Sequence, residues 1–318
     1  MNSNLTTFDA IIFGVYILGV LALGIYASGK GRKTKRDYFL AGDKLPWWMI
    51  GGSILAANIS THQIVGVMGV AYSRGFVAVV IEWGAILIGF NVLLWVFLPF
   101  YLRNGFYTMP EFLQKRFGGA ARAIYSFLVL MTYIFVEIGA VLFLGAISLH
   151  ELLSIPMMPS ILIIAVFTGV YTIAGGLRAV VWTEMLQICV LIIGMITLSV
   201  ATINAAGGVP ALMATSKDWK IFLPANDPDF PWTQYLGGTL CISIFYCATN
   251  QFIVQRTLAA KNEWHARMGV IFSQFLKFLT PILIIAPALV SVKLFPNLEK
   301  PDLLFVELVE HLLPSGLV

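Results

Sequence analysis

The sequence predicts an all-α polytopic membrane protein, because apolar residues dominate the chain and gather in long runs. Hydrophobic residues make up 59% of it and charged residues only 11%, and the mean hydropathy is +0.87. A soluble domain carries about 25% charged residues. No basic stripe falls on a polar face, so we expect no nucleic-acid partner. We expect the lipid bilayer to surround most of the chain.

About eight apolar segments are candidates for transmembrane helices. Crossing a bilayer as a helix takes about 20 mostly apolar residues. In chain order, the predicted spans cover approximately residues 10–27, 47–72, 76–102, 123–149, 160–174, 179–205, 235–254 and 270–294.

The loops between these spans divide the basic residues unequally. The first, third, fifth and seventh loops hold fourteen of the twenty Lys and Arg residues, the opposite side holds five, and Lys277 lies inside a span. Cytoplasmic loops carry the excess of Lys and Arg. We therefore predict a multi-pass protein of the plasma (inner) membrane, with its N-terminus outside and the 29–44 loop in the cytoplasm.

A polar strip interrupts the second span at residues 56–63, where the sequence reads Ala-Ala-Asn-Ile-Ser-Thr-His-Gln. Unsatisfied polar groups are costly at this depth, so irregular backbone is tolerated only where protein or a cavity surrounds it. The strip therefore predicts a discontinuous helix that lines a cavity. Secondary transporters build substrate and ion sites from such helices.

The seventh span carries a second polar interruption, at residues 242–251. Two interrupted spans in corresponding positions are typical of inverted-repeat transporters. Alternatively, Asn250 and Gln251 merely cap the cytoplasmic end of a helix. In that case the helix is either unbroken, or its break lies at Ser243–Tyr246.

Two segments are predicted to lie outside the membrane. Residues 207–232 are rich in proline and aspartate, and form either a small helix or lid over the mouth or a plain linker. Residues 296–318 read as external too, and the chain stops there without a capping element. We expect residues 1–318 to be one truncated transmembrane domain of a longer protein.

Several motifs of this chain resemble the sodium:solute symporter family, and within it the sodium/glucose (galactose) cotransporter branch. The matching stretches cover residues 37–287 approximately. They include residues 37–42 (Asp-Tyr-Phe-Leu-Ala-Gly), 45–48 (Leu-Pro-Trp-Trp), 56–60 (Ala-Ala-Asn-Ile-Ser), 107–117, 171–177 and 250–261.

The resemblance implies the LeuT-type fold, in which two five-helix repeats have opposite topology. Residues 10–27 would form an extra helix before the core, and residues 46–205 the first repeat. Residues 206–234 would form an external loop, and residues 235–318 the start of the second repeat.

The resemblance also implies a substrate site between the two broken helices. Gln63, Glu82 and Lys277 match sugar-binding positions of the family, and charged groups make strong hydrogen bonds to hydroxyls. Tyr246 matches the tyrosine that stacks under the sugar ring, with Asn58 as its hydrogen-bond partner. Ser60 and Ser243 complete the expected substrate-binding residues.

Sodium is the coupling ion that the resemblance implies. The carbonyl oxygens of Ala56 and Ile59 match its ligands, and the remaining ligands would lie beyond residue 318. Glu184 matches an acidic position linked to cation passage in relatives, although an interfacial acid solvated at a helix end is the simpler interpretation. We expect no organic cofactor.

Three further observations concern the substrate. Ser243 stands where the branch often has asparagine, and Ile81 and Ala85 replace polar residues of galactose-type proteins, which puts galactose itself in doubt. Glu137, in the middle of a span, is predicted to reach the cavity, bind a proton or pair with another group.

The leading hypothesis is sodium-coupled symport of a small neutral solute, a sugar or sugar-like molecule, into the cell by alternating access. The alternatives are a symporter of another small solute (a polyol, a carboxylate or an amino acid) and a membrane sensor with the same fold. We expect no enzyme, because the sequence contains no metal triad and no nucleophile with a positioned base.

Overall fold

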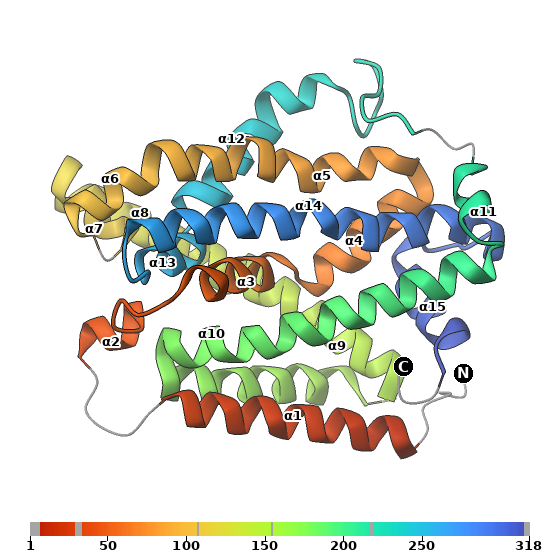
Figure 1. Cartoon of the computed structure of the whole chain (residues 1–318), viewed down its shortest axis with the longest axis horizontal. Coiled ribbons are helices and arrows are strands. Elements are labelled where there is room, and N and C mark those ends of the chain that lie inside the picture. Colours follow the sequence, from red (N-terminus) through yellow and green to blue (C-terminus); the bar gives the residue numbers. More distant parts are fainter. Residues whose placement is uncertain (1–6, 29–33, 107, 154, 216–218, 315–318) are drawn as a thin grey trace.

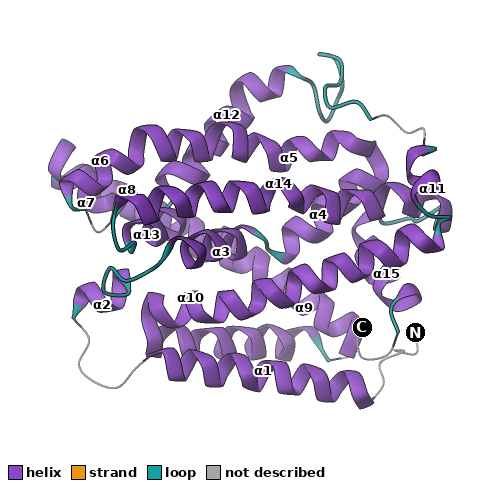
Figure 2. Cartoon of the chain, in the orientation of Figure 1, coloured by secondary structure: helices purple, strands orange, loops and turns teal. Residues whose placement is uncertain are grey.

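We describe the protein from a computed structural model, in which residues 7–28, 34–106, 108–153, 155–215 and 219–314 are described. Nearly all of these residues lie in helices, as Figure 2 shows. They contain no β-strand, and two isolated bridges join Leu45 to Ala260 and Leu223 to Pro231. The prediction of an all-α protein is confirmed.

The helices follow one another in the order that Figure 1 colours from red to blue. Those of the first half are α1 (Thr7–Ser28), α2 (Lys35–Leu40), α3 (Trp47–Asn58), α4 (Thr61–Arg74), η1 (Gly75–Ala78), α5 (Val79–Gly84), η2 (Ala85–Phe90), η3 (Leu93–Phe97), α6 (Leu98–Asn104), α7 (Met109–Phe117), α8 (Gly119–Thr132), η4 (Tyr133–Ile138) and α9 (Gly139–Leu153). Those of the second half are α10 (Met157–Ala205), α11 (Val209–Met213), η5 (Tyr235–Thr239), α12 (Leu240–Ile244), η6 (Phe245–Thr249), α13 (Gln251–Leu258), α14 (Glu263–Leu294), η7 (Pro301–Leu303) and α15 (Leu304–Leu312).

Five described helices are long and apolar enough to cross a membrane, or six when the bent pair Tyr235–Thr249 and Gln251–Leu258 counts as one span. This count is below eight because α3 and the first part of α10 are too short to span a membrane alone, and because α4 to α6 run on across a sharp turn without a loop. Gly75 has φ +84° between α4 and η1, and Gly176 has φ +63° and ψ −160° inside α10. Both values are left-handed, which glycine adopts without steric cost. Dividing the chain at these glycines, and joining α3 to α4, recovers the predicted segments.

The first predicted break is confirmed. α3 ends at Asn58 and α4 begins at Thr61, with extended backbone at Ile59 and Ser60 between them. The second break lies within the predicted interruption at residues 242–251. Residues 243–246 stay helical, so the alternative at Ser243–Tyr246 is wrong, and the chain bends by 41° at Asn250, which has φ −69° and ψ +127°. Asn250 is therefore the break itself rather than the cap of an unbroken helix.

The short helix α2 begins the segment that carries the Asp-Tyr-Phe-Leu-Ala-Gly motif. Thr34 caps it, and Asp37 reciprocates by accepting hydrogen bonds from the Thr34 hydroxyl at 2.6 Å and the Thr34 backbone N–H at 3.0 Å. These hydrogen bonds hold the pKa of Asp37 below its ordinary value. The motif is thus explained in part as a capping box that starts a helix.

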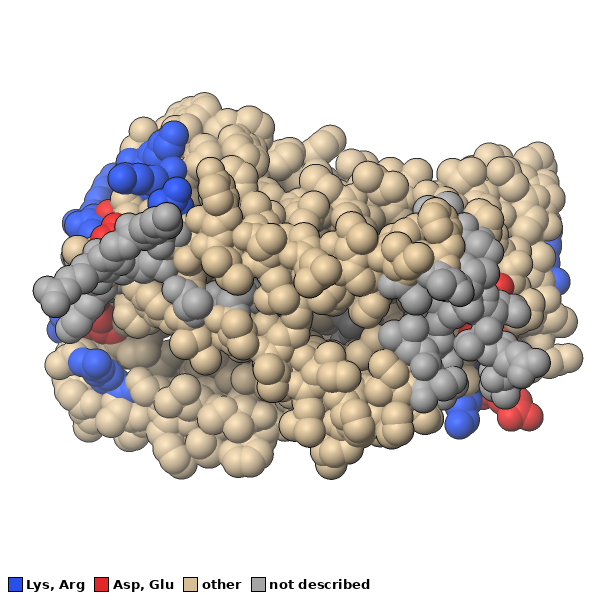
Figure 3. All heavy atoms as spheres, turned by 90° about the horizontal axis from the view of Figure 1, so that it is seen from below, with Lys and Arg blue, Asp and Glu red and all other residues tan. Residues whose placement is uncertain are grey.

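Two apolar clusters hold the helices together. The first joins α3 to α6, η6, α13 and α14, and includes Ile50, Ile54, Leu98, Ala248, Ile253 and Val270. The second joins α4 to α10, α14 and α15, and includes Met68, Ala71, Leu198, Ile285 and Leu308. By contrast, α8 and η4 have no buried residue among those described. Figure 3 shows the charged side chains at the two ends of the molecule and an uncharged surface between them, as a bilayer requires.

The segment between α10 and η5 contains the small helix that the sequence predicted, α11, followed by a loop. The loop is tied to the end of α4, because Arg74 forms ion pairs with Asp227 at 3.9 Å and with Asp229. Trp219 adds a ring contact to Phe76 at 5.1 Å. Figure 1 shows α11 at the same end of the molecule as α15 and the start of α1.

Glu184 lies in the part of α10 that follows the turn at Gly176, and it is only 8% exposed. Its carboxylate accepts hydrogen bonds from the Ser53 hydroxyl of α3 and the Arg256 guanidinium of α13. Arg256 also donates to the Ser53 hydroxyl at 2.7 Å. The interpretation of Glu184 as a solvated interfacial acid is therefore wrong, because a buried cation from another helix holds it inside the protein.

This buried pair predicts a non-additive effect on stability. Arg256→Met should lower the free energy of unfolding by about 3–5 kcal/mol, because it leaves the Glu184 carboxylate buried and unpaired. The double variant Arg256→Met/Glu184→Leu should recover most of the loss. Thermal unfolding of the purified protein in detergent compares them, and a double variant whose loss equals the sum of the single losses would contradict the pairing.

A second prediction concerns Gly89, where η2 approaches the seventh span. A Cβ added there would lie 2.8 Å from the Cβ of Cys247 and would also collide with the carbonyl oxygen of Ser243. Gly89→Ala should therefore cost about 1–3 kcal/mol by overpacking. Gly14→Ala in α1 is the matched control, since a Cβ there has nothing within 4 Å. Equal thermal stability of the two variants would contradict the close approach.

Candidate functional site

A cavity of about 630 Å³ opens beside the first break. Helices α4, η4, α12, η6 and α14 all contribute to its wall. The predicted site residues Asn58, Ser60, Gln63, Ser243, Tyr246 and Lys277 line it. The structure therefore brings together residues that lie more than two hundred positions apart in the sequence.

A buried ion pair lies beside this cavity, and of its two members Lys277 lines the cavity while Glu82 does not. Lys277 of α14 lies 2.9 Å from the carboxylate of Glu82 of α5. Both are inaccessible to solvent, with Glu82 0% and Lys277 1% exposed. Neither charge could stay buried alone, because desolvating one ion without its partner costs several kcal/mol. The pair thus fixes α5 against α14.

The two amides on either side of the first break complete the network. Gln63 donates from Nε2 to the Glu82 carboxylate, and Asn58 accepts from the Lys277 ammonium at 3.0 Å. The carbonyl oxygen of Gln63 is buried and has no hydrogen-bond partner among the described residues. It is available to accept a hydrogen bond from a ligand, since buried polar atoms are nearly always paired.

The break positions Gln63 directly. Ser60 is the N-cap of α4, and its hydroxyl accepts a hydrogen bond from the Gln63 backbone N–H at 3.4 Å. Such a cap replaces the missing intrahelical partner at the start of a helix. The neighbouring side chain of His62 lies outside the described side chains.

Tyr246 occupies the cavity wall but lacks the predicted partner. Asn58 bonds Lys277 instead of Tyr246, because a cation is a stronger hydrogen-bond partner than a phenol. The Tyr246 ring packs edge-on against Phe252, with ring centroids 5.3 Å apart. Its hydroxyl makes no hydrogen bond to the described part of the chain. The expected Asn58–Tyr246 contact is therefore absent from this structure.

Two further residues near this network, Trp83 and Asp302, were not predicted from the sequence. The Trp83 ring stacks on Phe278 with ring centroids 5.2 Å apart and an interplanar angle of 8°, next in the chain to Glu82 and Lys277. Asp302, in the segment before α15, also lines the cavity. Its place follows from tertiary packing on α4, where Gly69 leaves room for it.

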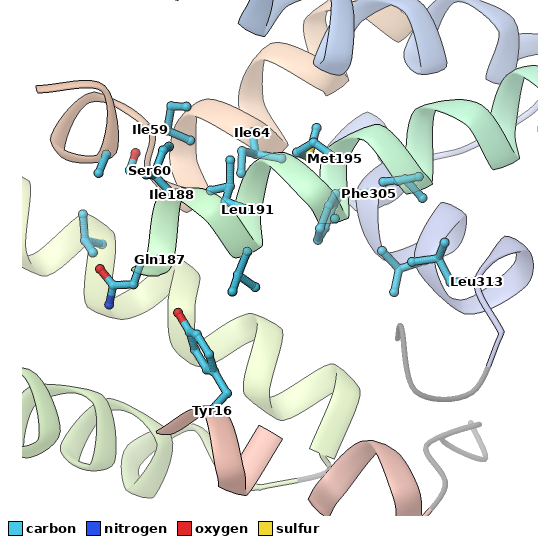
Figure 4. Close-up of a pocket in the computed structure, with 16 residues that line it drawn as sticks. Tyr16, Ile59, Ser60, Ile64, Gln187, Ile188, Leu191, Met195, Phe305 and Leu313 are labelled. Atoms are coloured by element: carbon cyan, nitrogen blue, oxygen red, sulfur yellow. The ribbon is translucent and has the colours of Figure 1, made fainter. Parts of the chain in front are cut away.

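The first break also faces a second cavity, of about 610 Å³, between α4, α10 and α15. Figure 4 shows Ile59 and Ser60 at one end of it and Phe305 and Leu313 at the other. Ala56 lines it as well, and no described group donates a hydrogen bond to the carbonyl oxygen of Ala56 or Ile59. Free carbonyl oxygens are the kind of ligand that hard cations take. The break thus fits a sodium ion in part.

Tyrosine hydroxyl groups donate hydrogen bonds to the polar groups of the second break. Tyr101 donates to the carbonyl of Ala248 at 3.1 Å, and Tyr125 donates to the carbonyl of Thr249 at 3.3 Å. Tyr133 donates to the side chain of Asn250. These phenols satisfy groups that the interrupted helix leaves open. The carbonyls of the second break are therefore already occupied, unlike those of the first.

Comparisons with known proteins agree with this geometry. The sequence profile of the sodium:solute symporter family matches residues 38–318. The chain is 37% identical to the sodium/glucose cotransporter of Vibrio parahaemolyticus, over 90% of this chain and 55% of that protein. It is 35% identical to sodium/myo-inositol cotransporter 2 of Sus scrofa, over 97% of this chain and 51% of that protein. The chain thus spans about half the length of these relatives.

The fold is similar to that of a solved protein described as a Na⁺-coupled sialic acid symporter in a substrate-bound, outward-open state. The TM-score is 0.88 at 21% identity, over 98% of this chain and 67% of that one. This likeness confirms the LeuT-type fold. With the family profile, it identifies a multi-pass membrane protein. The chain belongs to the sodium:solute symporter family.

Proposed function

We propose that the protein carries out sodium-coupled symport of a sugar or a sugar-like polyol by alternating access, and that it is not an enzyme. The observation that carries the proposal is the buried Glu82–Lys277 pair beside a cavity at a broken helix. Structural ion pairs alone require no cavity. Here the pair holds the amide of Gln63, a cavity-lining residue whose carbonyl oxygen has no hydrogen-bond partner among the described residues.

The cavity suits a molecule with many hydroxyl groups. Gln63 offers a free carbonyl oxygen, and Ser243 offers a hydroxyl that is 5% exposed and makes no hydrogen bond to the described residues. The Tyr246 ring and hydroxyl provide an apolar face and a polar tip, as a pyranose or cyclic polyol requires. Asn58 and Ser60 hold the break in place behind these groups. Relatives named for glucose and for myo-inositol support this class of solute.

Sodium is proposed to bind at the first break, where the carbonyl oxygens of Ala56 and Ile59 have no described partner. Two oxygens do not surround a hard cation, so further ligands are needed. The ion and the solute would share the α3–α4 break, since Gln63 and Asn58 flank the same residues. Binding of one would thereby order the site of the other.

The arrangement in the membrane is proposed from the charge distribution and the fold. The N-terminus would be outside and the 29–44 loop in the cytoplasm, because the basic residues gather on that side. Residues 46–205 would form the first repeat and residues 235–318 the start of the second. Transport would follow from rocking one bundle against the other around the cavity.

The proposal is tested by uptake of labelled glucose, galactose, mannose and myo-inositol into proteoliposomes, with and without an inward sodium gradient. We expect sodium-dependent uptake of at least one of them. Lys277→Ala should abolish it, because the variant leaves Glu82 buried and unpaired. Gln63→Ala should lower it about tenfold or more, by loss of a hydrogen bond to a charged group and one to the solute.

Gly14→Ala serves as the control for handling and insertion, since it lies on α1 away from the cavity. Full sodium-dependent uptake by both site variants would leave the family's activity in place and refute the site. Absence of uptake of all four solutes, with protein correctly inserted, would refute the proposed substrate class.

A further inference from the structure

Glu137 is one of two charged residues of the cavity that the network described above does not use; the other is Asp302. Glu137 lies in η4, a π-helical turn in the middle of the long helix formed by α8, η4 and α9. A π-turn inserts one extra residue and changes which side chains face inward, and such turns are frequent at functional sites. The Glu137 side chain is exposed and lines the cavity together with Tyr246 and Lys277.

The charges in the cavity wall do not balance. Lys277 is already neutralised by Glu82 at 2.9 Å, and both are buried. Glu137 and Asp302 also line the cavity, and neither forms an ion pair with any described residue. Lys277 is the only basic residue among the described residues that line the cavity. The described cavity thus has two carboxylates in excess.

An uncompensated carboxylate is costly at this position. Glu137 lies near the middle of a predicted membrane span, where ionisable residues are rare and are normally paired. Sodium is not the expected partner, because the carbonyl groups free to bind it, at Ala56 and Ile59, line the second cavity instead. A positively charged group of the solute is therefore the partner that the lining of this cavity favours for Glu137.

The neutral groups of the cavity set the rest of the solute's chemistry. Ser243 is 5% exposed with an unpartnered hydroxyl, and the buried carbonyl oxygen of Gln63 lacks a donor. Both groups can bind hydroxyls. A molecule that meets them and Glu137 together carries several hydroxyl groups and one protonated amine.

We propose that the cavity selects an amine-bearing sugar or amino-polyol, whose protonated amine binds the carboxylate of Glu137. The inference rests on the proposed function, since it names the solute of the same cavity. Asp302, at the mouth of the same cavity, adds negative potential that attracts such a cation.

The test compares sodium-driven uptake of labelled glucosamine, galactosamine and mannosamine with that of glucose, galactose and mannose, and uses N-acetylglucosamine as an uncharged amide. We expect the protein to take up one of the amines at a half-saturating concentration at least about tenfold lower than its parent sugar. Glu137→Gln keeps the shape and removes the charge, so it should abolish this preference. Glu299→Gln, an exposed carboxylate outside the cavity, should preserve it.

Each result decides the proposal. Equal or better uptake of the parent sugars by the wild-type protein would overturn it and leave sugar symport standing. A Glu137→Gln variant with altered sodium dependence but the same ranking of solutes would overturn it and make Glu137 an ion ligand. No sodium-driven uptake of any of these compounds would overturn both the inference and the proposed function.

Discussion

The ion pair between Glu82 and Lys277 is the constraint on which the rest of the site depends. Two charges at bilayer depth are tolerable only when every neighbouring group is arranged to stabilise them. Asn58 and Gln63 do so from the two sides of the break between α3 and α4. A continuous helix would orient these two side chains differently. The break therefore follows from the pair as much as from its own sequence, and it exposes the carbonyl groups that an ion needs.

The two breaks differ in what satisfies the backbone carbonyl groups that an interrupted helix leaves without a partner. At the second break, Tyr101 and Tyr125 occupy the carbonyls of Ala248 and Thr249, so the backbone is satisfied by protein alone. At the first break the corresponding carbonyls have no described partner. Because a carbonyl that already accepts a hydrogen bond is a poorer ligand, the first break is suited to binding and the second to bending.

Most of the fold could be predicted from the sequence, because helices in a membrane are set by local hydrophobicity and breaks by local polarity. The roles of Gln63, Glu82 and Lys277 came from the resemblance to the family, and the structure places these three polar side chains in one network. Reasoning from the sequence failed at Glu184, which looked like a solvated acid until Arg256 was placed beside it. It left the exact position of the second break open, because the choice between Ser243 and Asn250 depends on tyrosines from distant helices.

The sequence by itself determined the class of protein, the order of its apolar segments and the unequal division of its basic residues between alternate loops. All of these depend on composition and on charges near in the chain. Only the tertiary structure decided the pairing of Glu82 with Lys277, the hydrogen bond of Asn58 to that lysine rather than to Tyr246, and the position of Glu137 in the cavity without an ion-pair partner among the described residues. These outcomes depend on distances between helices, since a charge at bilayer depth is stabilised by whichever group the packing brings within a few ångströms.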